Sequence, residues 1–362
     1  MDFVNGIPVI GIVVQFIAYL VHALATTDTP AITLSLATPI ALGAMCGVMN
    51  ERSGVVNIGI EGMMLTSAFV GFMAALAFQT ATGPADPSSI FGATPALLVG
   101  VVAAILAGMA VSALHAWLSI SVRADQIISG TVINITALGL TGYLNRLLKP
   151  TASAGSFQPF QPPEFIADLP LVGWLFRMFL NVGPITMSVI VLAIILHVFL
   201  FRSRWGLRTR AVGEHPGAAD TVGIDVIRLR YRNVIVGGIF AGLAGAWLTL
   251  DYGSSFQNGM TAGRGFIALA AVIFGRWTPL GAFAGALLFG ASDAIGIAIR
   301  SNPPPGDLGA FLTGIQQAYP SLYNNFFGSL PYLLTLVILA GVVGRSVAPA
   351  AVGKPYVKEG AT

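Results

Sequence analysis

Long apolar runs separated by short polar stretches dominate this chain. A helix needs about twenty predominantly apolar residues to cross roughly 30 Å of hydrocarbon, and many runs here approach that length. The pattern therefore predicts an all-α bundle of about ten transmembrane helices. The predicted spans cover residues 7–25, 31–49, 59–78, 95–119, 126–148, 182–201, 233–251, 265–276, 279–299 and 328–344.

The run at 265–276 differs from the others because it is too short to span alone. It ends in the polar and proline-containing stretch Arg276, Thr278 and Pro279. Broken helices survive at membrane depth only where they are buried in protein or line a wet cavity. We therefore expect at least one broken or short helix, and a transport path beside it.

Composition agrees with a membrane location. Of the 362 residues, 55% are hydrophobic and only 9% are charged, which leaves too little polar surface for a soluble globule. The net charge of +3 comes from one loop and the C-terminal tail, so it gives no reason to expect a nucleic-acid partner. Cys46 is the sole cysteine, and we assemble no metal constellation and expect no cofactor.

The basic residues predict the orientation of the chain. Seven of the 18 Lys and Arg residues lie in a polar loop at 202–232. A cytoplasmic N-terminus and C-terminus place thirteen of the 18 inside and five outside, which satisfies the positive-inside rule. We accordingly predict a transmembrane domain at 1–345 with an outward Pro-rich loop at 149–181, and a cytoplasmic tail at 346–362.

The segment NERSGVVNIGIEGMML at 50–65 carries the polar residues that we consider for a site. We expect a helix to open at about Asn57, with Asn57 as its N-cap and Glu61 on the same face. Glu61 then has two interpretations. It is either a carboxylate stabilised by the helix dipole or a residue that lines or gates a pathway.

Few ionisable residues lie near the centres of the predicted spans, where Glu61 and Asp293 are the strongest candidates. For Asp125 and Asp251, near the predicted membrane interfaces, we favour solvated carboxylates at helix ends. Isolated histidines such as His115 are expected to be buried and hydrogen-bonded. This scarcity disfavours an ion-coupled secondary transporter or channel, which remains the alternative class.

Four stretches together resemble a known family. They are TPIALGAMCGVMNERSGVVNIGIEGMML at 38–65, RADQIISGTVIN at 123–134, AVGEHPGAADTVGIDV at 211–226 and GFIALAAVIFGRWTPLGA at 265–282. They resemble the permease subunits of ATP-binding cassette (ABC) importers for simple sugars and nucleosides. The same superfamily includes ribose and branched-chain amino-acid permeases.

The resemblance implies a short cytoplasmic helix that docks on an ATPase subunit. The stretch at 213–224 is similar to the family pattern G-x-[NS]-P-x-A-A followed by G-I, with His215 in place of Asn or Ser. Pro216 suits the first turn of such a helix. An ordinary solvated basic connector is the alternative. The implied coupling residues are Gly213, Glu214, His215, Pro216, Ala218, Ala219, Gly223 and Ile224.

The resemblance also implies partners and a path. It implies a non-catalytic subunit in the plasma (inner) membrane, paired with itself or a sister permease, an ABC ATPase, and an extracytoplasmic solute-binding protein. No P-loop motif occurs in the chain, so ATP hydrolysis is expected on the separate ATPase. The expected solute is a nucleoside or simple sugar. Its expected path residues are Asn57, Glu61, Asn134 and Phe266.

Overall fold

The structure is a computed structural model in which every regular element is helical among the residues described. Those residues are 14–15, 17–19, 29–83, 90–150, 152–160, 179, 181–304, 306–341 and 346–358. The longer helices are α3 (Thr29–Glu51), α4 (Ile60–Thr82), α5 (Pro95–Ala116), α6 (Gln126–Leu148), α9 (Pro184–Arg202), α12 (Val226–Ala246) and α14 (Pro279–Ser301). The shorter ones are α10 (Arg204–Glu214), α11 (Pro216–Thr221), α13 (Arg264–Phe274), α15 (Asp307–Ala318), α16 (Pro320–Gly328) and α17 (Leu330–Gly341). A 3₁₀ turn η1 (Ile90–Gly92) precedes α5, and π-helical turns η2 (Trp117–Ser121) and η3 (Trp247–Asp251) extend α5 and α12.

Seven helices among the described residues are long and apolar enough to cross a membrane. They are α3, α4, α5 with η2, α6, α9, α12 with η3, and α14, and each overlaps a predicted span. The predicted short span is α13, whose 11 residues are apolar but too few to cross alone. The predicted span at 7–25 lies mostly outside the described residues, and the span at 328–344 is described only through α17.

The described chain divides into two compact units. One contains residues 1–37, 161–181 and 287–344, and its apolar cluster joins Ile299, Tyr323 and Phe327. Helices α15 and α16 belong to this unit, and the sequence pattern did not predict them. Their residues Tyr323 and Phe327 pack inward, whereas many other side chains of these short helices are exposed, so no long apolar run marks them.

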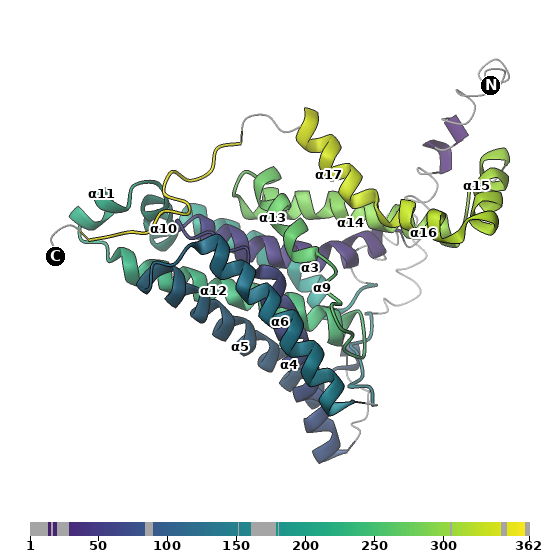
Figure 1. Cartoon of the computed structure of the whole chain (residues 1–362), viewed down its shortest axis with the longest axis horizontal. Coiled ribbons are helices and arrows are strands. Elements are labelled where there is room, and N and C mark those ends of the chain that lie inside the picture. Colours follow the sequence, from purple (N-terminus) through teal and green to yellow (C-terminus); the bar gives the residue numbers. More distant parts are fainter. Residues whose placement is uncertain are drawn as a thin grey trace. The chain divides into compact units, whose positions relative to one another are not determined.

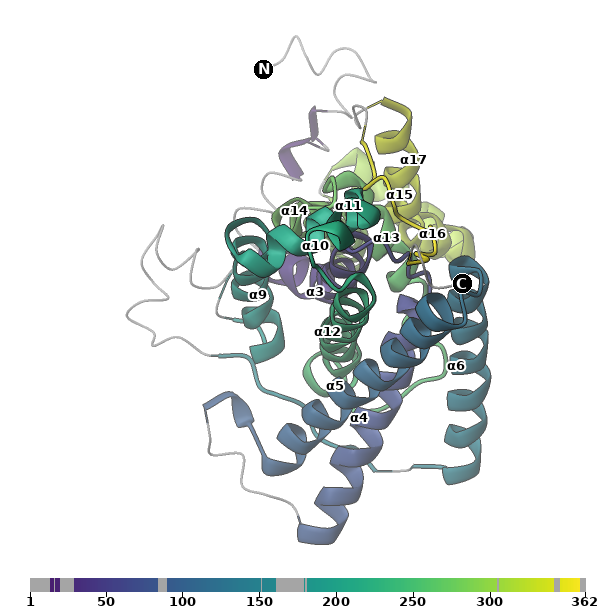
Figure 2. The ribbon, with the colours of Figure 1, turned by 90° about the vertical axis from the view of Figure 1, so that its left-hand side faces the viewer.

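The second unit contains residues 38–160, 182–286 and 345–362. Helix α5 packs against both α4 and α12, and the three run side by side in Figures 1 and 2. A side-chain carbon at Gly238 would lie 2.6 Å from the Gly108 carbonyl oxygen, so only glycine permits this approach of α12 to α5. The glycine-rich run at 237–246 therefore serves helix packing.

The polar segment at 202–232 is largely helical, and its helices go beyond the single short one that the family resemblance implied. Helix α12 begins at Val226, several residues before the predicted span, since Asp225 accepts a hydrogen bond from the Arg228 amide at 2.9 Å. Helix α10 begins after Ser203, whose hydroxyl accepts from the Gly206 amide at 3.0 Å. Local capping thus folds a segment whose polarity alone suggested a connector.

Candidate coupling surface and translocation path

The expected coupling residues lie across the junction of α10, α11 and α12. Pro216 occupies the first turn of α11, as predicted. His215 precedes α11 at the N-cap position, but its side chain makes no capping hydrogen bond. Its carbonyl accepts the Ala219 amide at 3.0 Å instead. Gly223 ends the helix with a φ of 84°, a conformation that favours glycine.

A small apolar core holds α11 in place. Ala219 packs with Val212, Val226 and Leu229, and the half-buried side chain of Ile224 covers them. This core joins residues of α10, α11 and α12, so the short helix is fixed to its neighbours. It could not hold its position alone at this length.

The two expected contact alanines have different environments. Ala218 is exposed, whereas Ala219 is only 3% exposed and lies in the core just described. Exposed apolar side chains also stand on α10 and just after α11, at Leu207 and Val222. The outward surface of this junction therefore includes small and apolar groups that a partner could cover.

Residues 346–358 of the C-terminal tail lie across the same junction (Figure 1). The Ala351 amide donates to the Gly213 carbonyl at 2.9 Å, and the Ala350 amide donates to the Glu214 carboxylate at 3.0 Å. The Tyr356 side chain packs against the apolar core of α11. From the sequence, these residues were predicted only to form a cytoplasmic tail. Backbone hydrogen bonds do not depend on the type of side chain, so no residue pattern indicates this contact.

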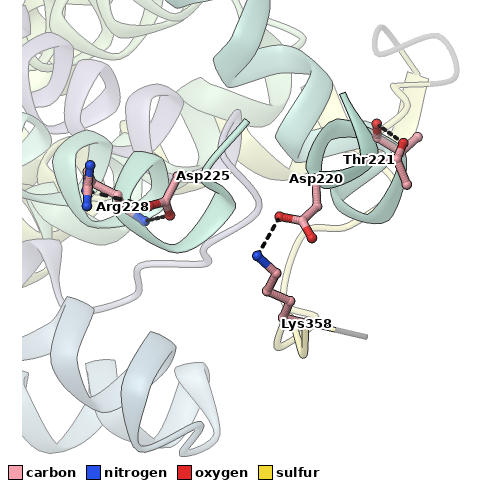
Figure 3. A network of polar contacts seen from close by, with 6 residues as sticks. Asp220, Thr221, Asp225, Arg228 and Lys358 are labelled. Atoms are coloured by element: carbon pink, nitrogen blue, oxygen red, sulfur yellow. Dashed lines mark hydrogen bonds and ion pairs between the residues drawn. The ribbon is translucent and has the colours of Figure 1, made fainter. Parts of the chain in front are cut away.

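A cavity of about 510 Å³ opens between α11, the start of α12 and the tail. Its lining carries both signs of charge, and Figure 3 shows Lys358 beside Asp220, with their charged atoms 3.8 Å apart. Arg228 and Asp225 lie 3.5 Å apart near the same opening. Three of these four side chains are more than half exposed, so the two pairs contribute little to stability.

The turn after α3 touches the end of α10. The Arg52 carbonyl oxygen lies so close to Gly213 that no side chain fits there. The Arg52 guanidinium lies over the Phe201 ring at 5.7 Å, as Arg210 does at 4.9 Å. Burial lowers the pKa of Arg52, the Glu214 carboxylate opposes this shift, and Arg210 adds to it.

Asn57 corrects another prediction. Helix α4 begins at Ile60, so Asn57 precedes it and is not its N-cap. The Asn57 carboxamide oxygen accepts the Gly59 amide at 3.0 Å, and the side chain is fully buried beside Met63. Such a local turn competes with helix formation and delays the start of α4. Asn57 and Glu61 therefore share no helix face.

Glu61 lies in the first turn of α4 and reaches the N-terminus of α13. One carboxylate oxygen accepts the Gly263 amide at 2.8 Å, and the other accepts the Gly265 amide at 2.6 Å. A carboxylate at a helix N-terminus satisfies free amides and interacts favourably with the helix dipole. The dipole interpretation of Glu61 thus extends to a second helix, α13, through a contact that the sequence did not predict.

Asn134 ties α6 to the turn before α4. Its amide donates to the Ile58 carbonyl at 2.9 Å, and its oxygen accepts the Gly62 amide at 2.7 Å. Phe266, by contrast, leaves half of its surface exposed on the first turn of α13. The structure therefore gathers Glu61, Asn134 and the start of α13 around the beginning of α4.

Several polar residues have the structural roles that the sequence suggested. Asp125 caps α6 by accepting the Ile127 and Ile128 amides at 2.8 and 3.0 Å. The His115 imidazole is buried between the Ser129 hydroxyl at 3.1 Å and the Val56 carbonyl at 2.9 Å. Among the residues described, no group of three His, Cys, Asp or Glu side chains could hold a metal ion.

The comparisons with known proteins agree over nearly the whole chain. The family model described as "Branched-chain amino acid transport system / permease component" matches residues 29–339. The chain is 38% identical to the guanosine ABC transporter permease protein NupQ of Bacillus subtilis, over 90% of this chain and 95% of that protein. No solved structure matches it.

Two further relatives extend the comparison. The nucleoside ABC transporter permease protein NupC of Lactococcus lactis is 33% identical over 90% of this chain and 95% of that protein. A putative glucose ABC transporter permease protein of Haloferax volcanii is 34% identical over 87% of this chain and 91% of that protein. With its membrane-length helices and these matches, the chain is a multi-pass membrane permease and belongs to the family of branched-chain amino acid transport system permease components.

Proposed function

We propose that this chain is the plasma-membrane permease subunit of an ABC importer whose solute is a nucleoside. The observation that carries the proposal is the near full-length similarity to two proteins named as guanosine and nucleoside permeases. The similarity to a putative glucose permease supports a simple sugar as the second candidate. The chain itself carries no chemistry in this proposal, and a separate ATPase subunit hydrolyses ATP.

The surface proposed to receive the ATPase is the outward side of α10, α11 and the residues after them. Three features support this choice: α11 is short, its exposed residues are small, and its core fixes it to α10 and α12. A surface that transmits force must not move independently of the helices behind it. Of the expected coupling residues, Ala218 and His215 are exposed for contact, and Ala219 supports the helix from inside.

The proposed orientation places this surface and the tail in the cytoplasm, with both termini inside. The high density of arginine at 202–232 supports it through the positive-inside rule. A second permease copy or a sister subunit completes the pathway, and an extracytoplasmic binding protein delivers the solute. Transport then proceeds by alternating access, in which ATP biases the bundle between two states.

The proposed path passes the N-terminus of α13. Phe266 exposes an aromatic face there, and such a face can stack on a nucleobase. Asn57, Glu61 and Asn134 make hydrogen bonds within the protein, and we assign them to the wall that holds this region in place. The path therefore depends on the exposed ring more than on the buried amides.

Competition for uptake tests the solute. Vesicles containing the complete transporter should accumulate labelled guanosine, and unlabelled nucleosides should abolish this uptake whereas glucose should not. Phe266→Ala should raise the KM for the nucleoside about tenfold, the size expected from losing one stacked base. Inhibition by glucose but not by nucleosides would replace the nucleoside with the sugar.

A further inference from the structure

Helix α13 is held at both ends by one short stretch of chain, residues 51–61. At its N-terminus, both Glu61 oxygens accept amides of Gly263 and Gly265. A side-chain carbon at Gly265 would lie 2.6 Å from the Glu61 backbone, so the start of α13 rests directly on the start of α4. This end of α13 cannot shift without breaking two charge-assisted hydrogen bonds.

The opposite end of α13 is held by the other end of the same stretch. Arg52 donates to the Trp277 carbonyl at 2.7 Å and to the Arg276 carbonyl at 3.2 Å. The Trp277 indole N–H donates to the Glu51 carboxylate. Both Arg276 and Trp277 have positive φ values, 51° and 54°, which are unfavourable for bulky side chains. These contacts therefore maintain a strained turn directly after α13.

The side of α13 is seated on α3 between these two ends. Side-chain carbons at Gly43 and Gly47 would each lie 2.9 Å from Ala268 and Val272, respectively. Two glycines four residues apart thus form a groove in α3 for the middle of α13. The helix is short, but its position is defined along its whole length.

The stretch 51–61 also contacts the proposed coupling surface. The Arg52 carbonyl lies against Gly213 at the end of α10, and the Gly54 carbonyl accepts the Gly353 amide of the tail at 3.2 Å. A displacement of α10 by a partner therefore acts first on the turn at 52–54. That turn is the point from which Glu51 and Arg52 hold the end of α13.

We propose that residues 51–61 are a mechanical linkage that moves α13 as one body when the coupling surface moves. Glu61 and Arg52 are then positioning residues: they place Phe266 and the start of α13 in the solute path without touching the solute. This inference rests on the proposed ATP-driven transport. It adds that the contacts at the two ends of α13 act together. Contacts that acted independently would not transmit a movement of the coupling surface to the whole helix.

A double-mutant cycle in the complete transporter tests the linkage. Glu61→Gln removes the carboxylate charge, and Trp277→Phe removes the indole donor but keeps a ring. Each variant should lower solute transported per ATP hydrolysed by about tenfold, the size expected from weakened hydrogen bonds to a charged group. The double variant should transport no less solute per ATP than the more impaired single variant, because either substitution alone already releases α13 from the linkage.

Asp125→Asn is the matched control, since it weakens a carboxylate cap on a different helix. It should leave transport per ATP unchanged. Basal ATP hydrolysis and complex assembly should be retained in every variant, and this retention separates a positioning effect from misfolding. Arg52→Lys provides a second probe of the end of α13 that is followed by Trp277. Multiplying losses in the double variant, or unchanged coupling in both single variants, would overturn the linkage. If the wild-type transporter shows no ATP-driven transport, the proposed function itself is refuted.

Discussion

Ala218 and Ala219 are chemically identical neighbours in opposite environments. Ala218 is exposed on α11, and Ala219 is buried against Val212 and Leu229. A large side chain at these two positions should therefore have two different effects. This contrast allows the docking function to be separated from the stability of the segment.

Ala218→Trp should abolish solute-stimulated ATP hydrolysis, because the bulky ring stands between α11 and the ATPase. Thermal stability of the permease should change little, since exposed substitutions usually alter it by less than about 0.5 kcal/mol. The measurement is ATPase activity of the assembled complex with and without solute, beside a melting curve of the permease. Normal stimulation in this variant would remove α11 from the docking surface.

Ala219→Trp should act through the core instead. Overpacking a filled site costs about 1–3 kcal/mol, so the melting temperature should fall before any partner is added. Limited proteolysis near α11 should accelerate in the isolated permease. A variant with unchanged stability would show that Ala219 is not held in the core described here.

Single residues also show what the sequence could and could not predict. Pro216 at the start of α11 and Asp125 at the N-terminus of α6 follow from local rules and were expected. The reach of Glu61 to Gly263 joins residues about two hundred positions apart, so no local pattern indicates it. The N-cap of α4 was predicted at Asn57 but is Gly59, two residues later, because the turn that Asn57 forms delays the helix.

The elements around the coupling surface depend on the tail. Residues 350–356 add backbone hydrogen bonds to α10 and an aromatic side chain to the core of α11. Arg230 of α12 also donates to the Lys354 carbonyl at 2.9 Å, although it lies far from the tail in sequence. The tail therefore packs and hydrogen-bonds with α10 and α11 as one structural unit.

Removing residues 346–362 should uncouple ATP hydrolysis from transport while the transmembrane helices remain folded. The deletion exposes apolar surface of the α11 core and frees Glu214 and Arg230 of their backbone partners. The readout is the ratio of solute transported to ATP hydrolysed. Deleting only 359–362 is the control and should preserve the ratio, and an unchanged ratio in the longer deletion would contradict the role assigned to the tail.

Hydropathy predicted the long helices well, because the thickness of the membrane fixes the minimum length of a helix that spans it. It identified α13 as short for the same reason. It did not predict α15 and α16, whose apolar residues form no long run, or the helical character of 202–232. Capping and tertiary packing, which hydropathy does not measure, determine those segments.

For the whole molecule, the proposed orientation makes a prediction about accessibility. Cys46 is fully buried, so introduced cysteines can be labelled one at a time. In right-side-out vesicles, a membrane-impermeant maleimide should label Ser153→Cys, and it should label Val222→Cys only after permeabilisation. The reverse pattern would place the coupling surface outside the cell and contradict the topology.

The source of energy is the central claim for the whole molecule. Vesicles that contain the permease with its ATPase and binding protein should accumulate labelled guanosine when ATP is supplied on the side of α11, without any ion gradient. A non-hydrolysable ATP analogue should prevent this accumulation. Accumulation that ignores ATP and follows a proton or sodium gradient would contradict the account and establish an ion-coupled carrier.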